Sequence, residues 1–309
     1  MRVLISTSSF AEHDKTPLNL LESNGFEVIL NPYKRRLNPG EVVELARNCE
    51  GIIAGTEQLT AEVFKQLPRL RAVSRCGVGM DNVDLEAARK HRIAISSTPD
   101  APTQSVAELT IALILNLLRR INFMDRQVRG GGWSKEMGRL LSGKTVGIVG
   151  LGRIGKRVAE LLIPFGVKIL ASEPKPDRKW VRENKVRLTP LKGLLKESDI
   201  VTLHVPYTEE NRNLINAGRL KIMKRGAILI NTSRGGLVDE DALYHALKSG
   251  YLGGAALDVM ETEPYHGSLK ELNNVILTPH IGSYAIEARV QMEIEAAKNL
   301  IKMLKEERK

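Results

Sequence analysis

The chain has 309 residues, of which 42% are hydrophobic and 27% charged, a composition typical of a globular protein with room for two separate cores. No apolar run is long enough to span a bilayer, the two cysteines suggest neither a disulfide framework nor a metal cluster, and the N-terminal MRVLIS lacks a signal-peptide layout, so we expect a cytoplasmic protein without a metal. The net charge of +10 is spread along the chain without a nucleic-acid motif, so the basic surface either attracts anionic metabolites or has no binding role, and we expect neither nucleic acid nor membrane as a partner.

Short β-branched runs alternate with helical patterns along most of the chain. This alternation predicts right-handed βαβ units and parallel sheets, and therefore an α/β fold. The predicted strands form a first series at residues 2–6, 26–30, 51–55, 71–74 and 93–96, and a second at 145–150, 168–172, 199–205, 227–232, 254–259 and 274–278.

A long helical pattern from residue 107 to 128 separates the two series, and the glycines of RGGGW end it. A second long helical pattern, from about residue 285 to 304, follows the last strand. Because no strand comes after it, this helix can cross back to the first series. We therefore predict a discontinuous substrate domain, residues 1–98 plus 285–309, and an NAD-binding domain, residues 99–284.

The glycines of GLGRIG have the spacing and the context of a dinucleotide-binding turn, since a predicted strand precedes them and a helix follows. Gly150 permits the tight turn, Gly152 lets a pyrophosphate approach the backbone, and Gly155 lets the helix pack on the strand. The helix N-terminus then supplies amide groups and a positive dipole for phosphates.

An acidic residue follows the next predicted strand. Glu173 lies 23 positions after Gly150 (173 − 150), close to the spacing at which a carboxylate binds the ribose hydroxyls and repels a 2′-phosphate. The sequence therefore predicts NAD as cofactor rather than NADP. Lys175 lies close by and can soften that preference.

A dinucleotide site beside a second domain suggests hydride transfer. That reaction needs a proton carrier near the substrate oxygen, and histidine is the usual one. Of the six histidines, only His204 and His280 end predicted strands, where doubly wound sheets bind ligands. His280 is followed by the small residues IGS, which leave room for a ligand, whereas proline stiffens the turn after His204. Arg234 also follows a buried strand. The acids that can hydrogen-bond His280 are Asp258, Glu261 and Glu263.

Six segments, among them GLGRIG, NTSRGGLVDEDAL and TPHIGS, resemble the NAD-dependent D-2-hydroxyacid dehydrogenases in their order and spacing. The resemblance covers nearly the whole chain. The family architecture implies two doubly wound parallel-sheet domains, a flavodoxin-like substrate domain and a Rossmann-like cofactor domain. It also implies NAD, a small 2-hydroxy or 2-keto acid as substrate, and a homodimer through the long helix and the GGGW region. The matching segments are SRCGVGMDNVDLEAA, GLGRIG, HVPYTEENRNLI, NTSRGGLVDEDAL, GAALDVMETEP and TPHIGS.

The resemblance also implies roles for individual residues. Arg234 would bind the substrate carboxylate and polarise the carbonyl, and Glu263 would pair with His280, which transfers the proton. The implied substrate contacts from the first domain are Arg75 and the backbone of Val78 and Gly79. The implied cofactor contacts are Gly150, Gly152, Arg153, Ile154, Gly155, Glu173, His204, Pro206, Thr232, Ser233, Gly282, Ser283 and, on the nicotinamide amide, Asp258.

The branch that the chain resembles most is short-form D-3-phosphoglycerate dehydrogenase, so we expect 3-phosphoglycerate and 3-phosphohydroxypyruvate, in serine biosynthesis. The chain departs from that branch by reading Ala54-Gly55 in place of an Arg-Ser pair for the substrate phosphate, and it lacks the expected asparagine near Pro102. Glyoxylate, hydroxypyruvate or another small 2-keto acid is therefore the alternative substrate. A protein that binds NAD as a sensor, without catalysis, is the alternative of another class.

Overall fold

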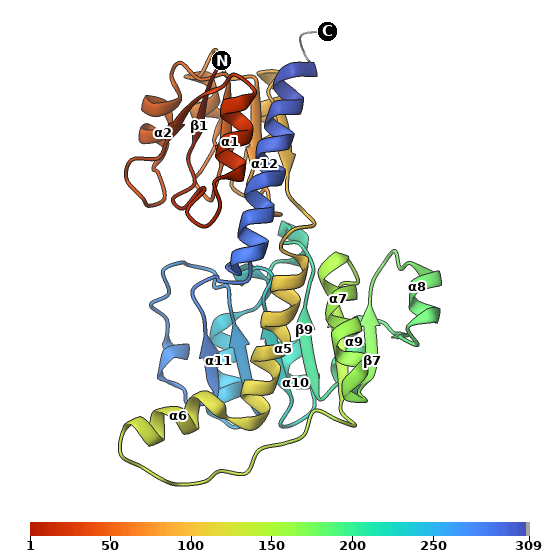
Figure 1. Ribbon diagram of the computed structural model, residues 1–309. Coiled ribbons are helices and arrows are strands. Elements are labelled where there is room, and N and C mark those ends of the chain that lie inside the picture. The colour runs from red at the N-terminus through yellow and green to blue at the C-terminus, as the bar shows by residue number, and fades with distance from the viewer. Residues whose placement is uncertain (307–309) are drawn as a thin grey trace. The chain divides into compact units, whose positions relative to one another are not determined.

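The computed structural model describes residues 1–306 of the chain (Figure 1). The chain folds into two compact units, Met1–Pro102 with the segment from Ser283 onward, and Thr103–Gly282. The sequence prediction set these divisions at residues 98 and 285, and it included residues 307–309, which lie outside the described part. Each unit has a parallel sheet between helices, so the predicted α/β class with two parallel-sheet domains is confirmed.

The first unit contains a five-stranded parallel sheet in the order β2-β1-β3-β4-β5, which is the flavodoxin-like order. Its strands are β1 (Arg2–Ile5), β2 (Glu27–Leu30), β3 (Gly51–Ala54), β4 (Ala72–Arg75) and β5 (Ala94–Ser97). Its helices are α1 (Thr16–Ser23), α2 (Pro39–Ala46), α3 (Ala61–Lys65), α4 (Leu85–Lys90) and α12 (Ile286–Glu306).

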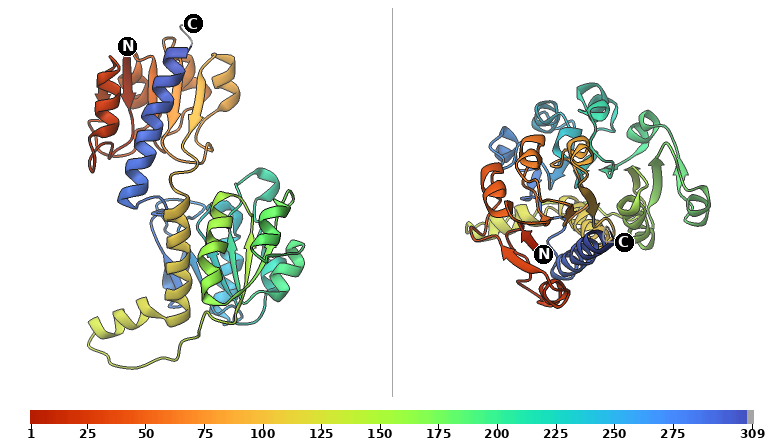
Figure 2. Two further views of the ribbon diagram at one scale, coloured as in Figure 1. Left: turned by 45° about the vertical axis from the view of Figure 1, so that its right-hand side comes forward. Right: turned by 90° about the horizontal axis from the view of Figure 1, so that it is seen from above.

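Alternating side chains of the first sheet bury its two faces separately, as expected for a parallel sheet covered on both sides. Val3 and Ile5 pack with residues of α1 and α12, whereas Leu4 packs with residues of α2, α3 and α4. Both views of Figure 2 show α12, in dark blue, running beside this sheet. The last predicted helix therefore completes the core of the first unit, as its position in the sequence indicated.

The second unit contains a seven-stranded parallel sheet in the order β12-β11-β10-β9-β6-β7-β8, a Rossmann order with one strand added. Its strands are β6 (Thr145–Val149), β7 (Lys168–Ser172), β8 (Arg187–Leu188), β9 (Ile200–Leu203), β10 (Ile228–Asn231), β11 (Gly254–Leu257) and β12 (Val275–Leu277). Its α-helices are α5 (Thr103–Arg119), α6 (Ile121–Arg129), α7 (Arg153–Leu162), α8 (Arg178–Glu183), α9 (Leu191–Glu197), α10 (Ala217–Ile222) and α11 (Glu240–Lys248). Short 3₁₀ helices cover Ile163–Phe165, Glu209–Asn211, Gly235–Leu237 and Ser268–Glu271.

Two features of the second unit differ from the sequence prediction. The single helix predicted over residues 107–128 is two helices, because Arg120 adopts a left-handed conformation with φ 54° between α5 and α6. The Arg120 guanidinium lies 4.7 Å from the centre of the Phe123 ring and pairs with Glu136, and these contacts hold the break. The short edge strand β8 was not predicted, since two residues are too few to show a period.

Candidate active site

The glycine turn between β6 and α7 is built by two close contacts and one open space. A Cβ atom on Gly150, which has φ 95°, would lie 2.5 Å from the carbonyl oxygen of His204. A Cβ on Gly155 would lie 2.0 Å from the carbonyl oxygen of Gly150, so α7 packs on the turn only because that side chain is missing. Gly152 caps α7, and its added Cβ would meet no described atom within 4 Å. The open space therefore lies at the helix N-terminus, where phosphates bind.

Glu173, which follows β7, is held against this turn. One carboxylate oxygen accepts a hydrogen bond of 2.9 Å from the N–H of Leu151, and the other accepts one of 3.0 Å from the N–H of Lys175. The acid thus stands beside the open helix N-terminus, where Arg153 and Ile154 form the first turn of α7. Gly150 and Gly155 thus leave no room for side chains, the space beside Gly152 is free for phosphate, and a carboxylate lies next to it. This arrangement fits the adenosine half of a dinucleotide.

Three neighbouring strands bring the predicted catalytic residues to one edge of the sheet. Arg234 follows β10, Glu263 follows β11 and His280 follows β12, and all three strands run parallel. His280 Nδ1 lies 3.0 Å from Glu263 Oε2. Both side chains are partly exposed, at 45% and 38%, so they are accessible to a small molecule.

The charge state of Glu263 follows from its surroundings. Burial favours its neutral form, but the hydrogen bond and charge of His280, the N–H of Met260 and the charge of Arg234 outweigh burial and lower the pKa of Glu263 below its ordinary value. Glu263 is therefore ionised at neutral pH. An ionised carboxylate at Nδ1 stabilises a protonated imidazole and fixes the ring orientation.

The loop that carries Arg234 is fixed by a buried asparagine that the sequence reasoning did not single out. Asn231 is 0% exposed; its amide nitrogen donates to the carbonyl oxygen of Arg234 at 2.8 Å, and its oxygen accepts from the N–H of Ser233 at 3.1 Å. Arg234 Nη1 donates to the carbonyl oxygen of Ser233 at 2.7 Å. A Cβ on Gly235 would lie 1.9 Å from the carbonyl carbon of Met260, so this loop packs directly on the loop of Glu263. The sequence did contain a signal for this role, because Asn231 is a polar residue at the end of an otherwise apolar strand.

Asp258 holds the loop of His280. Its side chain is 1% exposed; Oδ1 accepts from the hydroxyl of Thr278 at 2.6 Å and from the N–H of Ile281 at 2.8 Å, and Oδ2 accepts from the N–H of Gly282 at 2.8 Å. His280 itself has φ 55°. The described contacts of Asp258 are thus structural, whereas its contact with the nicotinamide amide stays a prediction.

His204 is the other candidate histidine, and burial keeps it neutral. Burial lowers the pKa of His204 to about 3, and its Nε2 lies 2.9 Å from the hydroxyl oxygen of Thr202. A neutral imidazole cannot donate a proton at neutral pH, so of the two candidate histidines only His280 suits proton transfer. His204 and Pro206 lie in the segment after β9, next to the glycine turn.

Helix α5 also contacts these loops, which the sequence reasoning missed. The hydroxyl of Ser105 donates to the carbonyl oxygen of Gly282 at 2.5 Å. The hydroxyls of Thr110 and Thr232 lie 3.1 Å apart in a buried contact. Serine and threonine inside a helix gave no signal, because such side chains usually bond to their own helix.

The remaining predicted residues belong to the first unit. Arg75 ends β4, and its guanidinium donates to the carbonyl oxygen of Cys76 and covers Gly77. Val78, Gly79 and Ser283 lie in loops of that unit, and Val78 is 42% exposed. Their contacts with a ligand stay predictions.

Residues 1–306 contain no group of three or more His, Cys, Asp and Glu side chains arranged to hold a metal ion. None of the helices described in that range is long and apolar enough to cross a membrane.

The chain is similar to known proteins along most of its length. A family model for the D-isomer specific 2-hydroxyacid dehydrogenase, NAD binding domain, matches residues 111–282. The chain is 45% identical to a glyoxylate reductase of Pyrococcus horikoshii, over 80% of this chain and 77% of the relative. It is 46% identical to a glyoxylate reductase of Thermofilum pendens, over 82% and 77%. A D-lactate dehydrogenase from Aquifex aeolicus, solved with NAD and lactic acid, aligns with a TM-score of 0.87 at 31% identity, over 99% of this chain and 96% of that one.

Proposed function

The chain belongs to the D-isomer specific 2-hydroxyacid dehydrogenases, which are NAD-dependent enzymes, and from this we propose that it reduces glyoxylate, hydroxypyruvate or a similar small 2-keto acid to the 2-hydroxy acid. The observation that carries the proposal is the meeting of Arg234, Glu263 and His280 at one sheet edge. The names of the two relatives support glyoxylate reduction over the expected 3-phosphoglycerate oxidation. Ala54-Gly55, in place of an Arg-Ser pair, agrees with a substrate without a phosphate.

Each catalytic residue has a step that its chemistry suits. The Arg234 guanidinium binds the keto-acid carboxylate through parallel donors and draws electron density from the adjacent carbonyl. Since Nδ1 of His280 is engaged by Glu263, Nε2 is the ring nitrogen that gives its proton to the carbonyl oxygen. Ionised Glu263 stabilises the imidazolium before that transfer. NADH, when bound, supplies the hydride to the carbonyl carbon.

The cofactor residues follow from the fit of the glycine turn. The amide groups of Arg153 and Ile154 would hold the pyrophosphate and Glu173 the adenosine ribose, so we propose a preference for NADH over NADPH. On the nicotinamide side we propose Ser283 of the first unit and the residues that follow β9 to β12 in the second unit, which are His204, Pro206, Thr232, Ser233, Asp258 and Gly282. For the substrate carboxylate we add Arg75 and the backbone of Val78 and Gly79 from the first unit.

We further propose a cytoplasmic homodimer that associates through α5, α6 and the GGGW region. Large apolar side chains that are more than half exposed in α6 and the segment after it support this proposal: Ile121, Val128, Trp133, Met137 and Leu140. Such side chains are typical of a subunit interface.

A panel of keto acids tests the reaction and the substrate separately. NADH oxidation should be fastest, by kcat/KM, with glyoxylate or hydroxypyruvate. A preference for 3-phosphohydroxypyruvate would restore the phosphoglycerate assignment and overturn the proposed substrate. NADH binding without oxidation by any keto acid would instead favour the sensor, since the fold alone does not fix a function.

A further inference from the structure

The loop after β4, in the first unit, contains two adjacent backbone donors that the fold itself does not use. Within residues 1–306, neither the N–H of Val78 nor the N–H of Gly79 donates a hydrogen bond. Val78 is 42% exposed, so these groups are accessible to a ligand. Successive backbone N–H groups form an anion site when the turn directs them toward one place. Their value for a carboxylate therefore depends on what holds the loop.

Thr98 holds the beginning of this loop. Thr98 follows β5 and is 0% exposed. Its side-chain oxygen accepts from the N–H of Gly77 at 2.8 Å, and its own N–H donates to the carbonyl oxygen of Gly77 at 3.0 Å. Gly77 has φ 143°, and a Cβ there would lie 1.5 Å from Arg75 Nη1, so the position accepts only glycine. One buried residue thus binds both backbone groups of the residue that precedes Val78.

Asn82 holds the end of the same loop. Its side-chain nitrogen donates to the carbonyl oxygen of Glu57 at 2.6 Å and to that of Gly55 at 3.3 Å. Its own carbonyl oxygen accepts from the N–H of Leu59 at 2.8 Å. All three partners lie in the segment that follows β3, the strand next to β4. Asn82 therefore ties the loop after β4 to the loop of the neighbouring strand.

The segment that receives Asn82 is itself fixed by a buried side chain. Glu57 is 1% exposed, and its carboxylate oxygens accept from the N–H of Gly55 at 3.0 and 3.1 Å and from the hydroxyl of Ser6. A Cβ on Gly55 would lie 3.1 Å from Glu57 Oε2 and 3.3 Å from Thr7 Cγ2, so the packing around this turn is tight. The acceptors of Asn82 therefore have a fixed position.

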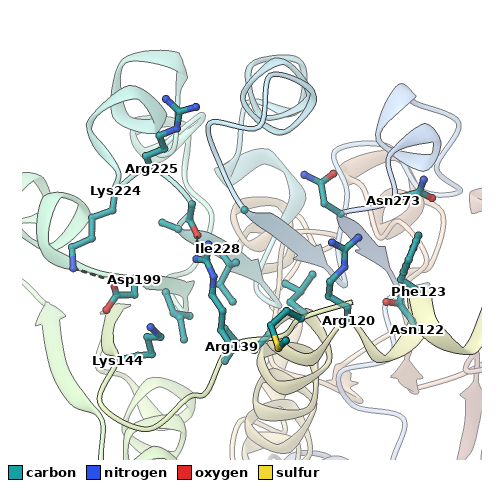
Figure 3. Close-up of a pocket in the computed structure, with 18 residues that line it drawn as sticks. Arg120, Asn122, Phe123, Arg139, Lys144, Asp199, Lys224, Arg225, Ile228 and Asn273 are labelled. Carbon is teal, nitrogen blue, oxygen red and sulfur yellow. Dashed lines mark hydrogen bonds and ion pairs between the residues drawn. The ribbon is translucent and has the colours of Figure 1, made fainter. Parts of the chain in front are cut away.

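The cations that line the cavity in Figure 3, in the second unit, are arranged differently. Arg120 pairs with Glu136, and Lys224 pairs with Asp199 at 3.0 Å, the contact that is dashed in Figure 3. Much of that lining comes from α5, α6 and the segment after α6, which we propose to bury between subunits. We therefore assign that cavity to the subunit interface, whereas the two unused donors after β4 belong to the first unit.

We propose that Asn82 and Thr98 are positioning residues, which hold the N–H groups of Val78 and Gly79 in place for the keto-acid carboxylate; this inference rests on the proposed function. Neither side chain has to touch the substrate. A loop that is already ordered loses less conformational entropy when the carboxylate binds than a loose loop does. Because the carboxylate is bound equally before and during hydride transfer, losing either residue should raise KM for the keto acid more than it lowers kcat.

A matched pair of asparagines tests the end of the loop. Asn31 follows β2 and is 8% exposed, and its amide also donates to two backbone carbonyls, those of Ser6 and Arg35, at 2.9 and 2.8 Å. Asn82→Ala should raise KM for glyoxylate or hydroxypyruvate by about tenfold or more, with kcat lowered less than about threefold. Asn31→Ala should lower the melting temperature similarly but change this KM less than about twofold, since it loosens a different loop.

Two substitutions of Thr98 test the beginning of the loop. Thr98→Val nearly keeps the shape but removes the acceptor of the Gly77 N–H, and it should raise KM for the keto acid by about tenfold. Thr98→Ser keeps the acceptor and loses only a buried methyl group, so KM should stay within about twofold even though stability falls. Calorimetric titration of the full chain, saturated with NADH, with the unreactive 2-oxo carboxylate oxamate measures binding without turnover, and its Kd should follow KM in every variant.

The paired variants separate this inference from the proposed function. Equal KM values in Asn82→Ala and Asn31→Ala, or in Thr98→Val and Thr98→Ser, would overturn the positioning role while leaving the proposed function intact. A fall in kcat at unchanged KM and unchanged oxamate affinity would overturn it too. An unmodified protein that reduces no keto acid and binds no oxamate would instead overturn the proposed function, and this inference with it, before any variant is compared.

Discussion

The backbone N–H of His280 donates to the carbonyl oxygen of Asp258 at 2.8 Å, while the Asp258 carboxylate accepts from the two residues that follow His280. One buried residue thus binds the backbone on both sides of the imidazole. This arrangement holds His280 at a positive φ, which few non-glycine residues adopt. The position of His280, the proposed proton donor, therefore depends on an acid that need not touch the substrate.

Asp258→Asn should lower kcat by about 10- to 100-fold, the range found when a residue that orients a metal ligand by a hydrogen bond is lost. The amide nitrogen would face the N–H of Ile281 or Gly282, so one donor would lose its acceptor. Because Glu263 and the glycine turn are untouched, KM for NADH should change less than kcat. An unchanged kcat with a large increase in KM for NADH would contradict the positioning role and leave Asp258 only its proposed contact with the nicotinamide.

Glu263→Gln should shift the alkaline limit of keto-acid reduction to lower pH. Reduction needs a protonated His280, and the glutamine cannot stabilise the imidazolium, so the proton is lost at a lower pH. The lowered pKa of Glu263 keeps this acid ionised near neutrality, so its own titration should not limit the unmodified enzyme there. His280→Asn is the comparison and should reduce kcat by about 10² to 10⁴ with no such shift. Near-normal turnover of His280→Asn would remove the histidine from the mechanism.

Arg234→Gln should raise KM for the keto acid and lower kcat, with a total loss in kcat/KM of about 10 to 10⁴, since each charge-assisted hydrogen bond contributes about 1.5–3 kcal/mol. Arg234→Lys should recover only part, because an ammonium keeps the charge without the two parallel donors. NADH affinity, measured by fluorescence titration, should barely change in either variant. Weakened NADH binding with normal keto-acid kinetics would move Arg234 to the cofactor pocket.

Glu173→Ser should narrow the preference for NADH over NADPH, which we expect to be about tenfold or more in the unmodified protein from one unfavourable charge contact. The substitution removes the carboxylate that repels a 2′-phosphate and leaves Lys175 to meet it. The ratio of kcat/KM for the two cofactors is the measurement. Equal use of both cofactors by the unmodified protein would contradict the role of Glu173.

Trp133→Asp with Met137→Asp should convert a dimer to monomers, because these side chains are 80% and 96% exposed in the segment after α6 and two charges would oppose their burial between subunits. Size-exclusion chromatography with light scattering gives the mass of the particle in solution. Lys179→Asp with Arg182→Asp on α8 is the control and should leave the mass unchanged. A monomeric unmodified protein would refute the proposed interface.

Strong local patterns explain what the sequence predicted. The strands were recognisable because buried parallel strands are nearly continuous apolar runs, and the turn at Gly150 because steric contacts demand glycine. The break at Arg120 was missed since the apolar period continues through it without glycine or proline. Asn231 and Ser105 were missed because a polar side chain at a strand end or in a helix does not reveal its partner. The partner of Ser105, for example, is Gly282, far away in the chain, and short sequence windows do not contain such pairs.

The close packing of Gly155 on Gly150 has a consequence for how such an enzyme changes over time. The residues proposed for phosphate and ribose lie within 150–173, whereas those proposed for proton transfer and polarisation of the carbonyl lie within 234–280. Substitutions that change the preferred nucleotide cofactor can therefore accumulate in the first stretch without altering the second. Changes that admit a new keto acid can likewise leave the glycine turn intact. We therefore expect that cofactor choice and substrate choice can change separately in this chain, so that a hybrid that exchanges only the first stretch keeps its substrate.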